Sequence, residues 1–214
     1  LARPDVFPSL VLMSAPFPGA PAFPFDTANG GVSAAPPNTD NQKLAAALAA
    51  LDPPRAHYQQ YLSTRPANED LWHPPEGLRR FLRTFFHVKS GDWPGNQPHP
   101  LKAPTAAELA RMPTYYVMEL GKTMPRNVAP FQPSAAEVQA CRWLTDPELD
   151  VYTAEYGRTG FQGALQAYRV FSDPRLTVEL RLFSGRTIDV PSLFIGGTRD
   201  WGTWSAPGAL DAMK

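Results

Sequence analysis

Asp200 is a carboxylate whose position in the chain suits catalysis. It follows the short apolar run 190–195 and a tight Gly-Gly-Thr-Arg loop at 196–199. A carboxylate at the carboxyl end of a strand suits the acid of a charge-relay group, although aspartate also favours turns and helix caps. Asp200-Trp201-Gly202 resembles part of a nucleophile elbow, but Thr198 stands where an elbow needs glycine. We therefore do not expect Asp200 to be a nucleophile.

Aromatic and polar residues gather in two further segments. Residues 57–61 read His-Tyr-Gln-Gln-Tyr, and residues 160–169 read Gly-Phe-Gln-Gly-Ala-Leu-Gln-Ala-Tyr-Arg. The chain has four histidines, without the spacing of metal ligands: His57, His73, His87 and His99. We expect neither a metal site nor a cofactor.

Two apolar runs, 10–13 and 190–195, predict buried strands of a parallel sheet. The residues between them predict helices and proline-bounded turns, with residues 17–39 forming no regular element. Helices are expected over 40–51, 55–62, from Pro75 through the apolar positions 78–86, from 145 to Gly157 or Gly160, and over 163–171. Capping-box pairs are Thr105 with Glu108, Ser134 with Glu137 and Thr145 with Glu148. This order of elements predicts a helical lid over an α/β sheet, whose ligands lie at the carboxyl ends of the strands.

Charge and composition narrow the class of partner. Lys plus Arg and Asp plus Glu are 20 each, so the net charge is zero and nothing draws the chain to nucleic acid or an acidic membrane. No window reaches the ~18 apolar residues of a membrane helix, and no secretory signal is visible. Cys141 is the one cysteine, so we expect no internal disulfide and a cytoplasmic setting. Arg79, Arg80 and Arg83 are predicted to lie on a solvated helix face.

The two aromatic segments resemble those of the epoxide hydrolases of the α/β-hydrolase fold. Their lids carry an H-Y-Q-x-Y-like segment and a G-F-x-G-x-L-x-x-Y-R segment. The second matches here at Gly160, Phe161, Gly163, Leu165, Tyr168 and Arg169. The opening of the chain at 11–17 also resembles the strand and loop that lead into such a lid. The resemblance covers nearly the whole chain.

The resemblance implies catalytic roles for Tyr58, Tyr168 and Asp200. One tyrosine from each segment would donate a hydrogen bond to the epoxide oxygen, and Asp200 would orient the histidine that activates water. A phenol suits the first role because its pKa near ~10 leaves it a neutral donor at working pH. Two phenols in a dry cavity can polarise the C–O bond and deliver a proton. The substrate would be a small-molecule epoxide; the oligomeric state is left open.

The resemblance also implies which parts lie outside the chain. No Gly-x-[Ser/Asp]-x-Gly elbow occurs, and no histidine follows Asp200. We therefore expect an interior fragment of a hydrolase that is inactive alone. It would comprise a core strand and loop (1–20), an α-helical lid (21–185), and a core strand, acid loop and helix start (186–214). The fold class expected is a partial α/β-hydrolase, mostly α-helical lid flanked by two parallel core strands.

Two other interpretations stay open. A haloalkane dehalogenase shares the fold and the ester chemistry, but its lid needs halide-binding donors, often tryptophan, in place of paired tyrosines. The chain could instead be a non-catalytic binding or interaction module built on a degenerate lid.

Overall fold

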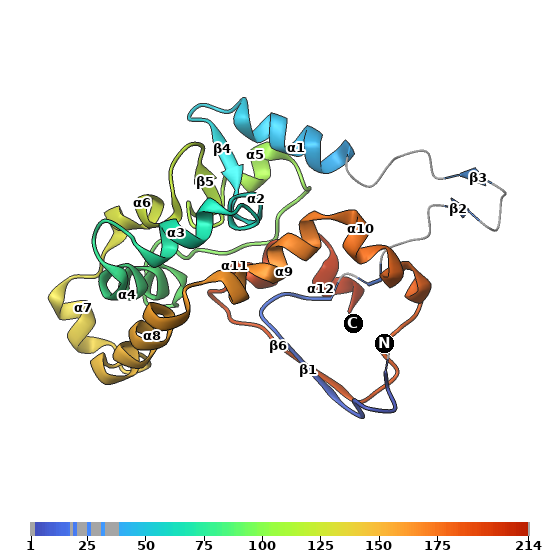
Figure 1. Ribbon diagram of the computed structural model, residues 1–214. Coiled ribbons are helices and arrows are strands. Elements are labelled where there is room, and N and C mark those ends of the chain that lie inside the picture. The colour runs from blue at the N-terminus through green and yellow to red at the C-terminus, as the bar shows by residue number, and fades with distance from the viewer. Residues whose placement is uncertain (1–2, 18, 21–24, 27–30, 33–38, 214) are drawn as a thin grey trace.

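The computed structural model describes residues 3–17, 19–20, 25–26, 31–32 and 39–213. Two strands far apart in the sequence, β1 (Leu10–Met13) and β6 (Ser192–Ile195), pair in parallel, with Leu10 opposite Ser192 and Met13 opposite Ile195. In Figure 1 this pair lies apart from the large helical layer that fills the other side of the molecule. Both predicted strands therefore form, and they lie side by side.

The expected burial of these two strands is wrong within this chain. The side chains of Val11, Met13, Leu193 and Ile195 are each at least half exposed. Among the described residues the pair is a two-stranded sheet, so each strand keeps an unpaired edge. Ala212 and Met213, at the end of α12 (Ala209–Ala212), line a pocket together with Leu12 and Phe194, whereas the four residues named above stay open to solvent.

A short antiparallel hairpin forms the centre of the helical layer. It joins β4 (Arg55–His57) to β5 (Val117–Glu119), with Ala56 opposite Met118. Neither strand was predicted. Residues 55–62 were expected to be one helix, but only α2 (Tyr58–Leu62) is helical. Pairing with β5, a contact between distant residues, outweighs the local preference of three residues for a helix.

The remaining elements follow the predicted pattern more closely. The helix α4 (Leu78–Lys89) begins after Gly77, whose φ of 84° lies outside the helical region, and not at Pro75. The helices α8 and α9 lie close to their expected positions, whereas α3 was not predicted. The other bounds are α1 (Thr39–Ala49), α3 (Pro66–Trp72), α5 (Ala106–Leu109), α6 (Met124–Val128), η1 (Ala129–Phe131), α7 (Ala135–Ala140), α8 (Asp146–Thr159), α9 (Gln162–Ser172), α10 (Pro174–Thr177), η2 (Val178–Phe183), α11 (Trp201–Trp204) and α12 (Ala209–Ala212).

Capping residues set several helix starts. Ser134 and Glu137 form a reciprocal capping box at α7, and Thr145 and Glu148 form one at α8, as predicted. At α5 the Thr105 side chain caps the helix, but the Glu108 carboxylate accepts from the Lys102 backbone N–H instead. That box is therefore only half formed.

The helical layer encloses its own apolar core. Its largest fully buried side chains include Phe81, Leu82, Met118, Met124 and Leu149, from α4, β5, α6 and α8. Arg83 is also buried, contrary to the expected solvated face: it donates to the Leu144 carbonyl at 2.5 Å and pairs with Asp146 at 2.8 Å. This arginine ties α4 to the start of α8.

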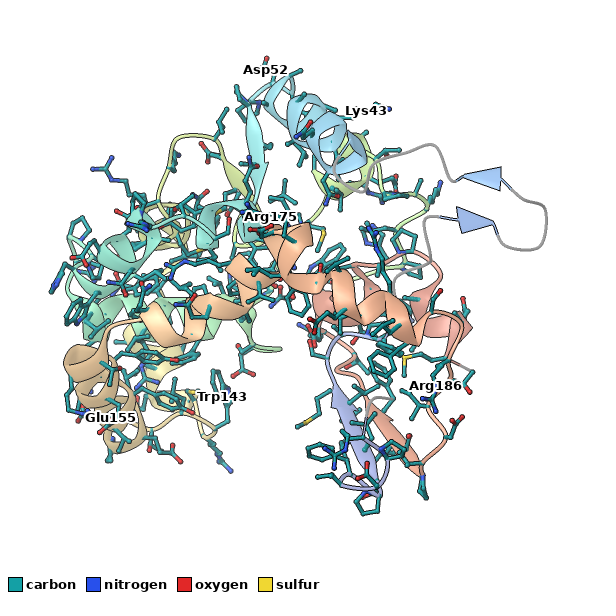
Figure 2. The ribbon with its side chains drawn as sticks, turned by 45° about the vertical axis from the view of Figure 1, so that its right-hand side comes forward. Lys43, Asp52, Trp143, Glu155, Arg175 and Arg186 are labelled. Carbon is teal, nitrogen blue, oxygen red and sulfur yellow. The ribbon has the colours of Figure 1, made fainter. Side chains whose placement is uncertain are left out.

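Two segments lie at the margins of this architecture. Within 17–39, a two-residue ladder pairs β2 (Phe25–Asp26) with β3 (Gly31–Val32); the rest of the predicted irregular excursion lies largely outside the described residues. In Figure 2, Trp143 and Glu155 lie at the far end of the helical layer, and Arg186 lies beside the strand pair. The chain thus has a packed helical region and a separate strand region joined through α9 and α10.

Candidate active site

Tyr58 is placed by the β4–β5 hairpin. Its backbone N–H donates to the Tyr116 carbonyl at 2.8 Å, so a hydrogen bond joins the first residue of α2 to the residue just before β5. His57 caps α2, its ring Nδ1 accepting from the Gln59 N–H at 3.4 Å. Strand pairing and this cap together set the direction in which the Tyr58 ring leaves the backbone.

Tyr168 lies on α9, which packs against α2. Leu165 is buried beneath it, and Phe161 at the helix start stacks on Tyr156 with ring centroids 4.2 Å apart. The rings of Tyr168 and Tyr58 lie edge to face, with centroids 5.8 Å apart and an interplanar angle of 78°. The structure thus brings the two sequence-predicted tyrosines together.

The hydroxyl groups of the neighbouring tyrosines are used differently. Tyr61 donates to Asp70 at 3.0 Å, and Tyr115 donates to the fully buried Asn96 at 2.6 Å. Tyr58 accepts a long bond from the Gln59 amide at 3.5 Å. Neither Tyr58 nor Tyr168 donates its hydroxyl proton to a residue that the structure describes. Both protons are therefore available to a ligand.

The surroundings keep these phenols protonated. Burial, and then the nearby Tyr168, raise the pKa of Tyr58 to about 12, and burial also raises the pKa of Tyr168. A buried phenol loses its proton reluctantly because the phenolate would be poorly solvated. Both groups are neutral hydrogen-bond donors at any ordinary working pH.

Tyr116 is a third phenol in this cluster, and sequence reasoning missed it. Its ring meets that of Tyr58 at 5.1 Å and that of Tyr115 at 4.9 Å. Burial raises its pKa strongly, with smaller contributions from the Tyr58 and Asp200 charges. The only sequence signal was its place in the adjacent pair Tyr115-Tyr116.

Asp200 lies in the loop between β6 and α11. Its carboxylate caps α11, accepting from the Gly202 N–H at 2.7 Å, so the structural alternative considered for this residue does occur. The same loop contacts the end of β1, since Thr203 donates to the Ser14 carbonyl at 3.0 Å. The charge of Asp200 also raises the pKa of Tyr115 and Tyr116. The carboxylate therefore lies close enough to Tyr115 and Tyr116 to oppose their ionisation.

Lys89 and His99 also lie at this junction, and neither was singled out from the sequence. The Lys89 ammonium lies 4.8 Å from the ring centroids of both Tyr115 and Tyr116. The His99 ring meets Trp201, the residue after Asp200, at 5.0 Å. No local pattern predicts either contact, because the partner rings are distant along the chain.

A cavity of about 590 Å³ opens beside the tyrosine pair, between α1, α2, α9 and residues 205–207. Tyr168 and His57 line it together with apolar residues of α1, whereas Tyr58 does not. Its volume lies within the range of small-molecule sites. Tyr168 therefore lies at the edge of this cavity, with Tyr58 next to it.

Two features are absent from the described part of the chain. No group of three or more potential metal ligands occurs among those residues. No helix there has the length and apolar character needed to cross a membrane.

Comparison with known proteins supports the resemblance seen in the sequence. The chain is 34% identical over 137 residues to epoxide hydrolase A of Mycobacterium tuberculosis, covering 59% of this chain and 41% of that protein. It is 30% identical over 137 residues to epoxide hydrolase 3 of Siraitia grosvenorii, covering 64% of this chain and 42% of that protein. The chain is therefore similar in sequence to part of these two epoxide hydrolases. No family model matches it.

A solved structure extends the likeness to the fold. A mutant of a potato epoxide hydrolase superposes with a TM-score of 0.55 at 20% identity, covering 99% of this chain and 50% of that one. The predicted α/β class, with a mostly helical lid and few parallel core strands, is confirmed. The chain spans between about two fifths and one half of these epoxide hydrolase relatives.

Proposed function

We propose that this chain provides the lid and acid loop of an enzyme that hydrolyses epoxides to vicinal diols. The observation that carries the proposal is the pair of phenol rings, Tyr58 and Tyr168, 5.8 Å apart on two separate elements. Neither hydroxyl donates its proton to a described residue, and the raised pKa values keep both protonated. Both properties suit a hydrogen-bond donor to a neutral, weakly basic oxygen. The names of the curated relatives support the same reaction.

In the proposed reaction the two hydroxyls each donate a hydrogen bond to the epoxide oxygen. A carboxylate nucleophile, implied by the family and outside this chain, attacks a ring carbon. The C–O bond breaks, its electron pair passes to oxygen, and one tyrosine proton follows. Hydrogen-bond donors aimed at the developing alkoxide lower the barrier because they are already oriented. The product of this step is an alkyl ester.

The second half-reaction hydrolyses that ester. A histidine outside this chain, oriented by Asp200, takes a proton from water, and the resulting hydroxide attacks the ester carbonyl. The ester C–O bond then breaks, and the departing alkoxide takes the proton that the hydroxide brought, which restores the carboxylate nucleophile. The proton held by the histidine returns to the phenolate when the diol leaves. Epoxide plus water therefore gives diol, and every donor is restored.

The proposal divides the chain into three parts. Residues 1–20 and 186–214 would belong to the core domain, and residues 21–185 would form the lid. The substrate would be a small-molecule epoxide that reaches the phenol pair from the 590 Å³ cavity. The cytoplasmic setting stays an expectation from the cysteine count alone.

Tyrosine-to-phenylalanine variants test the role of the hydroxyls. In the complete gene product that carries these residues, Tyr58→Phe and Tyr168→Phe should each lower kcat for an epoxide about 10²-fold, because each removes one oriented donor. The double variant should lose more. Tyr152→Phe is the matched control, because this exposed tyrosine lies on α8 and keeps its ring contact with Phe86.

Wild-type turnover by the double variant would refute the proposal. The 214-residue chain by itself should hydrolyse no epoxide, because the nucleophile and base proposed here lie outside it.

A haloalkane substrate is the second candidate. Trp201 supports it: this buried indole lies directly after Asp200, and its Nε1–H has no hydrogen-bond partner among the described residues. Indole donors of this kind suit a halide leaving group. Parallel assays of the complete gene product on an epoxide and on a haloalkane separate the two reactions.

A further inference from the structure

Lys89 is the last residue of α4, and aromatic rings from three places in the sequence surround its ammonium group. The distances from Nζ to the ring centroids are 4.8 Å for Tyr115 and for Tyr116, 5.2 Å for Phe85 and 5.9 Å for Tyr58. All four lie within the ~6 Å at which a cation is attracted to the face of an aromatic ring. Lysine is rarely placed among so many rings for solubility alone.

The ammonium group has no close anionic partner in the described part of the chain. No carboxylate there lies within the 4.0 Å that defines an ion pair, and Asp200 acts on Lys89 only through a longer-range attraction. Elsewhere in the lid, by contrast, Lys122 pairs with Glu119 at 2.7 Å. The positive charge of Lys89 is thus directed at the tyrosine cluster and is not cancelled locally.

A positive charge beside a phenol stabilises the phenolate more than the neutral phenol. The neutral ring offers only its quadrupole, whereas the phenolate carries a full negative charge. A nearby positive charge matters for the phenolate of Tyr58 because burial opposes ionisation of its hydroxyl group. A tyrosine that gives its proton to an opening epoxide is in that unfavourable state until the proton returns.

We propose that Lys89 is a positioning residue of this reaction, whose ammonium stabilises the negative charge left on Tyr58 when the phenol proton moves to the epoxide oxygen. The inference rests on the proposed function. The covalent step is unchanged: the electron pair of the C–O bond goes to oxygen, the phenol proton follows, and Lys89 keeps its own protons.

The electrostatic surroundings of Lys89 predict a pH dependence. Desolvation by the surrounding protein lowers the pKa of Lys89 to about 8, opposed by the Asp200 charge. The groups that face it are Asp200 and the phenols of Tyr58, Tyr115 and Tyr116, all of which are neutral near this pH except Asp200. Loss of the ammonium proton would therefore weaken catalysis as the pH rises through about 8.

The test compares three variants in the complete gene product. Lys89→Met keeps the length of the side chain and removes the charge, Lys89→Arg keeps the charge, and Lys102→Met is the control at an exposed lysine outside the cluster. The first readout is kcat for an epoxide at neutral pH, and the second is the pH profile of kcat across the neutral and alkaline range. Circular dichroism verifies folding.

Lys89→Met should lower kcat about tenfold in the neutral range, since a nearby positive charge that stabilises the phenolate by about one pKa unit changes the equilibrium about tenfold. It should also abolish the fall in activity near pH 8, whereas Lys89→Arg and Lys102→Met should behave like the wild type in the neutral range. In a Tyr58→Phe background, Lys89→Met should have little further effect on kcat.

Two results would overturn the inference: an unchanged pH profile of kcat in folded Lys89→Met protein, or an equal loss of kcat from the Arg and Met substitutions. Failure of the proposed function would look different. Wild-type protein would then turn over no epoxide, whereas failure of the inference alone would leave an active wild type and an equally active Lys89→Met variant.

Discussion

The helical lid and the β1–β6 strand pair contain similarly apolar sequences but cover them very differently. Phe81 and Leu149 in the lid are 1% and 0% exposed, whereas Val11 and Ile195 in the strand pair are 54% and 50% exposed. The lid helices and the β4–β5 hairpin bury one another's apolar faces. In the described part of the chain these strands form a two-stranded sheet, and the outward-facing side chains of Val11 and Ile195 contribute little burial.

The two regions therefore have different roles in the fold, one in its stability and the other in the placement of the loops. The free energy of folding should come mainly from the lid core, because that is where apolar surface leaves water. The strand pair contributes geometry: it brings the loops after β1 and β6 together, where Thr203 contacts Ser14 and Asp200 faces the tyrosines. The predictions below test this separation.

The largest effect is expected in the lid core. Phe81→Ala removes a fully buried ring that packs against Phe85 at 5.5 Å, and it should cost about 3–5 kcal/mol of unfolding free energy through lost burial and a cavity. Chemical denaturation followed by circular dichroism measures it. A loss of unfolding free energy below about 1 kcal/mol would mean that the lid core does not supply most of the stability.

A turn beneath the tyrosine cluster should give the next effect. A Cβ at Gly95 would lie 2.3 Å from the Trp93 ring, which itself packs on Tyr115 and Phe131. Gly95→Ala should therefore cost about 1–3 kcal/mol by overpacking. Gly163→Ala is the control, since a Cβ there meets nothing within 4 Å. Equal unfolding midpoints for the two variants would contradict the expected clash.

His57 should make the base of the Tyr58 helix sensitive to acid. Burial lowers its pKa from 6.5 to about 4, so the folded state binds this proton less readily than the unfolded state does. Stability should therefore fall as the pH drops from about 6.5 toward 4. His57→Asn keeps a capping acceptor without this titration, and should be about 1 kcal/mol less acid-sensitive near pH 5. An unchanged profile of unfolding against pH would exclude His57 as the cause.

The smallest effect is expected in the strand pair. Val11→Ala should change the unfolding free energy by about 0.5 kcal/mol or less, because this side chain is already mostly in water. The same denaturation series measures it beside Phe81→Ala. A cost comparable to that of Phe81→Ala would show that the strand faces are covered in solution, for example by association of chains.

Local sequence signals predicted the elements that depend on neighbours in the chain. The boxes at Ser134 and Thr145 fixed two helix starts, and Gly160 fixed the end of α8, because capping is a local interaction. The β4–β5 hairpin was missed because its strands are short and lie far apart in the sequence. Tertiary contacts decide such elements.

The residues of the candidate site divide in the same way, into those that a local motif predicts and those that only the fold brings together. Tyr58, Tyr168 and Asp200 were found through a family resemblance carried by short motifs. Lys89 and Tyr116 were not, because their importance comes from rings that converge only in the folded lid. Arg83 was misassigned for the same reason: a charged residue on a helix is usually solvated, but this one bridges to α8.

The Arg199 contact connects the two regions in a way that bears on motion. Arg199, next to Asp200, donates to the Gly91 carbonyl at 3.2 Å, and Gly91 follows Lys89 by only two residues. The loop that carries Asp200 and the segment after α4 are therefore joined by a hydrogen bond at the surface. If residues 21–185 moved away from this loop, that bond would break, whereas Lys89 and the rings around it would move together. Opening would thus separate Asp200 from the tyrosine cluster and leave the cluster itself intact.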